Sequence, residues 1–135
     1  MKALSVKQPW ANLIAYGQKT IETRLWITEY RGELLIVSSK TPKVEPAGFA
    51  LAVATLIECR PMELSDEKAA MCEVYEKAFA WLLRDIRPVK PFPVSGQLGI
   101  FDVDVAPSLL VPAPEFRPAL GLFEEPYGPQ TRKKL

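Results

Sequence analysis

Hydrophobic and polar positions alternate along several short stretches of the chain, and this period-two pattern predicts β-strands. The alternation is clearest over residues 97–105, where apolar Phe101, Val103 and Val105 alternate with aspartates. Over residues 49–58, large apolar residues occupy one face and alanines the other, which allows a helix or a barrel interior to pack closely. Five strands are predicted in all: residues 2–6, 19–26, 33–39, 49–58 and 97–105.

Two segments have the spacing of apolar positions that is typical of amphipathic helices. The first is residues 9–16, which begins at Pro9 and ends at Gly17, a residue suited to a left-handed cap. The second is residues 65–83, with Ser65 as its predicted N-cap. The apolar stripe of this second helix comprises Met71, Val74, Tyr75, Ala78, Phe79 and Leu82.

Prolines mark the remaining segments as extended. Residues 87–93 contain three prolines and are predicted to be a connector without helix. The last thirty residues hold six of the thirteen prolines, so we expect a domain over residues 1–105 and a proline-rich extension over residues 106–135. This extension should pack on the domain or trail from it, with Leu109, Leu110, Phe116 and Phe123 as its anchoring residues.

These elements predict an α+β fold: a small, mostly antiparallel, five-stranded β-barrel flanked by two helices. The composition fits one soluble domain, since the chain has 135 residues, of which 48% are hydrophobic and 24% charged. No apolar run approaches the roughly 20 residues of a membrane-spanning helix, and the first ten residues lack the apolar stretch of a secretory signal. We therefore expect a cytoplasmic protein without membrane contact.

The absence of histidine excludes several classes of chemistry. Ser-His-Asp and Cys-His nucleophiles and HExxH metalloproteases all require a residue that this chain lacks. Cys59 and Cys72 lie thirteen positions apart without further ligand residues, so they are interpreted as reduced structural thiols. No metal and no cofactor is predicted.

The net charge of +1 gives no overall electrostatic argument for a nucleic-acid partner. The charge is nevertheless uneven, with a net +3 over residues 1–40 and a net −3 over residues 41–105. This separation allows a local basic face, although ordinary scatter of surface charge explains it equally well.

The densest polar cluster is residues 17–24, which includes Lys19, Glu22 and Arg24. Strand periodicity places Glu22, Arg24 and Trp26 on one face and Thr23 on the other. A groove with an aromatic wall, one carboxylate and two cations suits a nucleobase, which can stack on the ring and bond to the charges. A surface ion pair between Glu22 and Arg24 is the competing interpretation.

The same residues carry a resemblance to a known family. Gly17, Lys19, Glu22 and Arg24 match the pattern G-x-K-x-x-E-x-R, and the chain resembles the ASCH (activating signal cointegrator homology) domains of the PUA-like superfamily. The segment SVKQPWA at residues 5–11 is similar to the cointegrator branch of that family, and so are Arg31-Gly32, Lys40 and residues 92–101. The resemblance covers residues 1–105.

The resemblance implies a PUA-like barrel that binds RNA, another single-stranded nucleic acid or a nucleoside in a cleft near the G-x-K-x-x-E-x-R motif. The expected ligand-binding residues come from the motif, from the QPW segment before it and from the end of the strand at residues 33–39. They are Lys7, Gln8, Pro9, Trp10, Lys19, Glu22, Arg24, Trp26, Ser38 and Lys40.

Two alternatives remain open from the sequence. The first is a hydrolase of RNA or of a modified nucleoside, similar to ribonucleases or N4-acetylcytidine amidohydrolases of the family, with Lys19 and Glu22 as catalytic residues. In the amidohydrolase branch a threonine follows the lysine after three positions, but Glu22 stands there in this chain. The second alternative is a protein-interaction module that uses the proline-rich extension.

Overall fold

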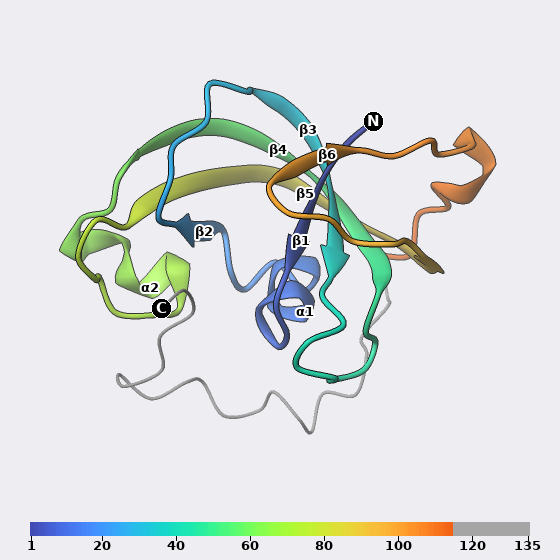
Figure 1. Ribbon diagram of the computed structural model, residues 1–135, viewed down its shortest axis with the longest axis horizontal. Coiled ribbons are helices and arrows are strands. Elements are labelled where there is room, and N and C mark those ends of the chain that lie inside the picture. The colour runs from blue at the N-terminus through green and yellow to red at the C-terminus, as the bar shows by residue number, and fades with distance from the viewer. Residues whose placement is uncertain (115–135) are drawn as a thin grey trace.

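The structure is a computed structural model that describes residues 1–114. A strongly curled sheet of six strands forms a half-barrel, and helix α1 lies on its concave side (Figure 1). The strands are β1 (Lys2–Val6), β2 (Ile21–Arg24), β3 (Gly32–Ser38), β4 (Phe49–Pro61), β5 (Phe79–Pro93) and β6 (Ile100–Asp102). The helices are α1 (Trp10–Ala15) and α2 (Glu67–Ala70), with 3-10 turns η1 (Leu64–Asp66) and η2 (Pro107–Leu109).

The sheet is mixed and has the strand order β2-β5-β4-β3-β1-β6. Only β1 and β3 pair in parallel, and the other neighbours are antiparallel. The predicted α+β, PUA-like fold is confirmed in its class, but the sheet has six strands and an open edge on each side instead of a closed barrel of five. The additional strand is β5.

The predicted helix over residues 65–83 is wrong beyond Ala70. Helix α2 ends where Met71 adopts a left-handed conformation with φ of 56°, and Lys77 repeats it with φ of 65°. The chain then enters β5, which pairs with β4 over most of its length and with β2 over its first four residues. Two residues of the apolar stripe that predicted a helix, Phe79 and Leu82, therefore belong to a strand that pairs with a neighbour on each edge.

The proline-rich connector predicted at residues 87–93 is the second half of β5. A proline cannot donate a backbone hydrogen bond, so strands accept it where one edge is unpaired. Strand β2 pairs with β5 only up to Leu82, so beyond that residue one edge of β5 has no partner strand in the six-stranded sheet. Residues 110–113 use that edge, because the Lys90 nitrogen donates to the Val111 carbonyl and the Ala113 nitrogen to the Pro88 carbonyl.

Three apolar clusters stabilise the fold. The largest joins α1 to the concave face, where Trp10 and Ile14 pack with Ala52 and Ala54, the small residues expected to admit a close neighbour. A second cluster lies on the other side of the sheet and includes partly buried Leu110. Leu109 is exposed instead of anchoring the extension, and Phe116 and Phe123 lie outside the described residues.

The cap of η1 provides a pH-dependent test of this fold. Asp66 accepts two hydrogen bonds from the Arg60 guanidinium, at 2.8 and 2.9 Å, and one from the Glu63 backbone nitrogen at 2.8 Å. These hydrogen bonds, chiefly those from Arg60, hold the pKa of the Asp66 carboxyl below its ordinary value. Asp66→Asn is expected to lower the free energy of unfolding by about 1–3 kcal/mol at neutral pH.

The effect of Asp66→Asn should disappear in acid. A carboxyl whose pKa is lower in the folded state stabilises the protein above its unfolded pKa of about 3.9 and loses this contribution as the pH falls through its folded pKa. Thermal melts of both proteins at pH 7 and pH 2 measure this. The difference in Tm should shrink at pH 2, and a difference independent of pH contradicts the assignment.

Candidate nucleic-acid interface

A glycine turn at the end of α1 positions the lysine of the motif. Gly17 has a φ of +82°, and its nitrogen donates to the Ile14 carbonyl while the Gln18 nitrogen donates to the Leu13 carbonyl. This is a Schellman cap, and it confirms the predicted left-handed end of the helix. The Lys19 nitrogen also bonds to the Leu13 carbonyl, so the turn fixes the direction in which the Lys19 side chain leaves the backbone.

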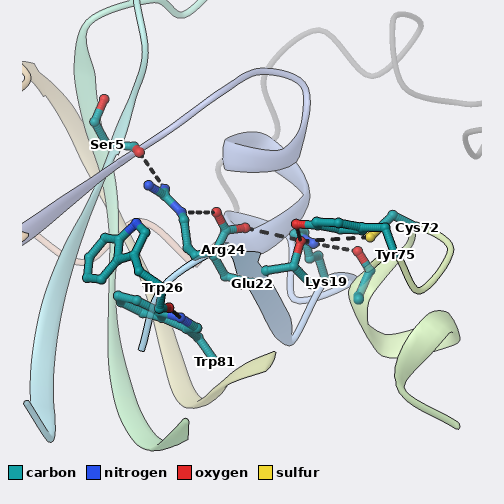
Figure 2. A network of polar contacts seen from close by, with 10 residues as sticks. Ser5, Lys19, Glu22, Arg24, Trp26, Cys72, Tyr75 and Trp81 are labelled. Carbon is teal, nitrogen blue, oxygen red and sulfur yellow. Dashed lines mark hydrogen bonds and ion pairs between the residues drawn. The ribbon is translucent and has the colours of Figure 1, made fainter. Parts of the chain in front are cut away.

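The three charged residues of the motif lie close together. Glu22 lies between the two cations: its Oε1 is 3.9 Å from the Lys19 Nζ, and its Oε2 is 2.9 Å from the Arg24 Nε (Figure 2). The Lys19 ammonium also donates to the Ala70 carbonyl at the end of α2. Arg24 continues the chain, since its Nη2 donates to the Ser5 carbonyl on β1 at 2.7 Å.

This network is buried. Lys19 and Glu22 have relative exposures of 0%, and Arg24 is 9% exposed. Burial lowers the pKa of Arg24 to about 10, an effect that the nearby Tyr75 opposes, so the guanidinium stays protonated at neutral pH. The pair of Glu22 and Arg24 is therefore not the solvent-exposed ion pair that was the competing interpretation of the motif.

Lys19 is placed as a hydrogen-bond donor beside a carboxylate: its Nζ donates to the Ala70 carbonyl and lies 3.9 Å from the Glu22 Oε1. Metal binding has no visible basis in residues 1–114, where no group of three or more cysteine, aspartate or glutamate side chains is placed to hold an ion.

Two residues that the sequence did not connect with the motif, Cys72 and Tyr75, contact the face of β2 opposite to Glu22. The Tyr75 hydroxyl lies 2.9 Å from the Thr23 Oγ1, and the Cys72 Sγ lies 3.9 Å from the same oxygen (Figure 2). The sequence placed Tyr75 on the stripe of a long helix, but it lies in the loop between α2 and β5. No local pattern could have shown this contact, because fifty-two positions separate Tyr75 from Thr23.

The three tryptophans have different environments. Trp10, an expected stacking residue, is buried in the cluster under the sheet, and Trp81 is fully buried on β5, as expected of a core residue. Trp26 is 38% exposed. Its ring packs edge to face on Trp81 at a centroid distance of 4.7 Å, and the Trp81 Nε1 donates to the Trp26 carbonyl at 3.2 Å.

Two of the predicted ligand-binding residues, Ser38 and Lys40, line a polar pocket of about 300 Å³. The Lys40 side chain crosses Gly48, where a Cβ atom would lie only 2.8 Å from the Lys40 Cε. The Ser38 hydroxyl bonds to the Phe49 backbone, so it shapes the wall of the pocket. The complete lining is Ser5, Ser38, Ser39, Lys40, Thr41, Gly48, Gly96, Gln97 and Leu98.

The pocket and the motif meet at Ser5. This residue lines the pocket, and its carbonyl accepts the hydrogen bond from Arg24. The QPW segment supports the same region from a second side, because the buried Gln8 side chain donates to the Asn12 side chain and to the Pro46 carbonyl, both at 2.9 Å. Pro9 caps α1, and Lys7 is exposed between β1 and α1.

A larger cavity of about 460 Å³ lies elsewhere, between β5 and residues 110–114. Apolar side chains and prolines form most of its lining among residues 1–114, where the charged lining residues are Glu33 and Arg87, which are paired at 2.6 Å. The smaller pocket is therefore the better candidate for a polar ligand, because it combines hydroxyl groups with a lysine.

Comparison with known proteins agrees with the fold. The ASCH domain family matches residues 4–93. The chain belongs to the ASCH domain family. Activating signal cointegrator 1 is 34% identical in its human form and 33% in its mouse form, each over 70 residues. That alignment covers 51% of this chain but only 12% of each cointegrator, so this ASCH domain spans a small part of its curated relatives.

A solved relative confirms the fold of this ASCH domain. The crystal structure of ASCH from Zymomonas mobilis superposes with a TM-score of 0.54 at 21% identity. The superposition covers 68% of this chain and 72% of that one. Among residues 1–114, no helix is both long enough and apolar enough to cross a membrane.

Proposed function

We propose that this ASCH domain binds single-stranded RNA by receiving a nucleobase in the polar pocket beside the motif. The observation that carries the proposal is the pocket itself, which joins hydroxyl groups and Lys40 to the motif through Ser5 and Arg24. Its volume of about 300 Å³ falls at the lower end of the range for small-ligand sites. The link between the ASCH family and nucleic acids supports the same partner.

The lining of the pocket suits the edge of a base. A hydroxyl group donates and accepts, so Thr41 can satisfy either polarity on a nucleobase, and Gln97 offers both an amide donor and an amide acceptor. The Ser39 hydroxyl is bonded to the Thr41 backbone and holds that residue in place. Sequence-specific recognition of RNA uses such contacts on bases that are unstacked and accessible.

Lysines around the pocket supply the contacts to phosphate. Lys7, Lys40 and Lys43 are exposed on the two loops that the Gln8 side chain joins. Such contacts are electrostatic and independent of sequence, and they account for much of the affinity of proteins for nucleic acids. The protein needs no large net charge for this, because the lysines gather beside the pocket.

In this proposal the buried motif does not touch the ligand but positions the wall of the pocket. Glu22 orients Arg24, and Arg24 holds the Ser5 carbonyl, so the motif fixes the position of β1 beside the ligand. Lys19 fixes Glu22 from the other side. The three residues are positioning residues, because Lys19 and Glu22 are fully buried and Arg24 is nearly so.

Lys40→Ala tests the proposal. Fluorescence anisotropy with a labelled single-stranded RNA, at several salt concentrations, should show weaker binding and a slope of log K against log salt that is smaller by about 0.7. Lys68→Ala, which removes an exposed lysine from α2, is the matched control and should leave both quantities unchanged. Equal affinity and slope in wild type and Lys40→Ala would show that the pocket is not the contact surface.

The same samples test the hydrolytic alternative. RNA and N4-acetylcytidine should be recovered intact after incubation, because the motif offers an ammonium instead of a free base. Products that accumulate in proportion to protein concentration would show turnover and would replace binding as the function of the site.

A further inference from the structure

An apolar lip borders the polar pocket. Leu98, in the loop between β5 and β6, lines the pocket and is 98% exposed. The next residue, Gly99, lies against Trp26: a Cβ atom on Gly99 would be 4.0 Å from the Trp26 Cη2. The lip formed by Leu98 and Trp26 therefore places an aliphatic side chain and an indole next to a hydroxyl-lined hollow.

The indole of the lip is held in place. Trp81 packs against it at an interplanar angle of 87°, and Gly99 limits it from the loop side. A Trp side chain that is fixed before binding loses little conformational freedom when a ligand stacks on it. Leu25 and Ile27, the chain neighbours of Trp26, are also exposed.

From these contacts we infer that the domain grips two consecutive unpaired nucleotides. The inference rests on the proposed function: one base enters the polar pocket, Leu98 wedges between it and its neighbour, and the neighbouring base stacks on Trp26. Lys40, which is exposed and lines the pocket, can contact the phosphate that joins the two nucleotides.

The order of the contacts along the chain fits a dinucleotide, because Leu98, at the pocket, is followed directly by Gly99, at Trp26. A base leaving the stack for the pocket creates an unstacked face, which an apolar wedge can cover. A base-paired duplex must first be unstacked at a cost in free energy, so it should bind more weakly than a single strand.

Leu98→Ser tests the inference without disturbing the core, since the side chain is exposed. Binding of a labelled ten-nucleotide single-stranded RNA should weaken about tenfold. Binding of a blunt-ended RNA duplex, the weaker ligand, should change less than twofold. Leu64→Ser, which removes a leucine that is 71% exposed on η1, is the matched control and should bind both RNAs like the wild type.

Tryptophan fluorescence gives a second readout. Trp26 is the exposed member of the three tryptophans, so the single-stranded RNA should quench emission and protect it from acrylamide. Both effects should be absent in Trp26→Phe.

The outcomes separate the two proposals. If the wild type binds neither RNA, the proposed function fails and the inference fails with it. If the wild type binds single-stranded RNA and Leu98→Ser binds it within twofold of the wild type, the lip makes no contact and only the inference is overturned. The same conclusion follows if Leu98→Ser weakens binding of the duplex and of the single strand equally. If single-stranded DNA of the same sequence binds as tightly as RNA, the two-nucleotide contact stands, but it applies to both nucleic acids.

Discussion

Glu22→Gln is expected to lower the free energy of unfolding by about 3–5 kcal/mol. The variant keeps the shape of the side chain but removes its charge, which leaves two buried cations, Lys19 and Arg24, without their shared carboxylate. Removing one partner from a buried ion network costs more than the network contributes to stability, because the remaining charges stay desolvated. Urea denaturation at neutral pH measures the change.

Glu76→Gln is the matched control, because Glu76 is exposed in the loop between α2 and β5. Its free energy of unfolding should stay within about 0.5 kcal/mol of the wild type. A loss below 1 kcal/mol in Glu22→Gln would contradict a buried network. Combining Glu22→Gln with Lys19→Met should restore part of the lost stability, because the double variant removes one of the two unmatched cations.

Trp81→Ala is expected to lower the free energy of unfolding by about 3–5 kcal/mol. Trp81 is fully buried, faces Glu22 across the β2–β5 pair, and supports the Trp26 ring from beneath. Its removal leaves a cavity under the motif and deprives the Trp26 carbonyl of its hydrogen bond from the indole nitrogen. Thermal and urea denaturation measure the loss.

Trp81→Phe separates packing from hydrogen bonding. It retains most of the ring volume and loses the indole nitrogen, so its cost should be about 1–3 kcal/mol. RNA binding should survive in Trp81→Phe if Trp26 keeps its place. Equal stability of the wild type and Trp81→Ala would contradict the core position of this residue.

The sequence predicted the motif region well because its geometry is local. Gly17 ends α1 within one turn, and the strand that follows begins four residues later, so the spacing of Lys19, Glu22 and Arg24 determines their approach. Period-two alternation separated Glu22 from Thr23, and the structure places their partners, Arg24 and Tyr75, accordingly. What the sequence could not show was burial, which depends on α2 and β5 closing over these residues.

The longest wrongly predicted segment is the helix over residues 65–83, and the error has a physical reason. Apolar residues recur there at three- and four-residue intervals, yet Met71 and Lys77 break the helix with left-handed backbone conformations that no pattern of hydrophobicity signals. The prolines of β5 also argue against a strand. They are tolerated because β2 pairs with only the first four residues of β5. Pairing with β4, distant along the chain, overrides both local signals.

The sequence predicted a ligand site formed by the motif, the QPW segment and the end of the strand at residues 33–39. Of the ten expected residues, two line the pocket, Ser38 and Lys40, and Thr41 and Leu98 join them from two loops that meet only in the folded state. Trp10 was expected to stack on a ligand and instead packs under the sheet, because an indole near the start of an amphipathic helix serves the core. Trp26 is the exposed indole that could take that role.

Mapping backbone amide shifts by NMR while titrating a short single-stranded RNA tests the proposed interface most directly. The largest changes should occur in Ser5, in residues 38–41, in Gly48 and in residues 96–99, with a further shift of the Trp26 indole NH. Changes concentrated around the apolar cavity at residues 86–89 and 110–114, or no changes at saturating RNA, would contradict the proposal.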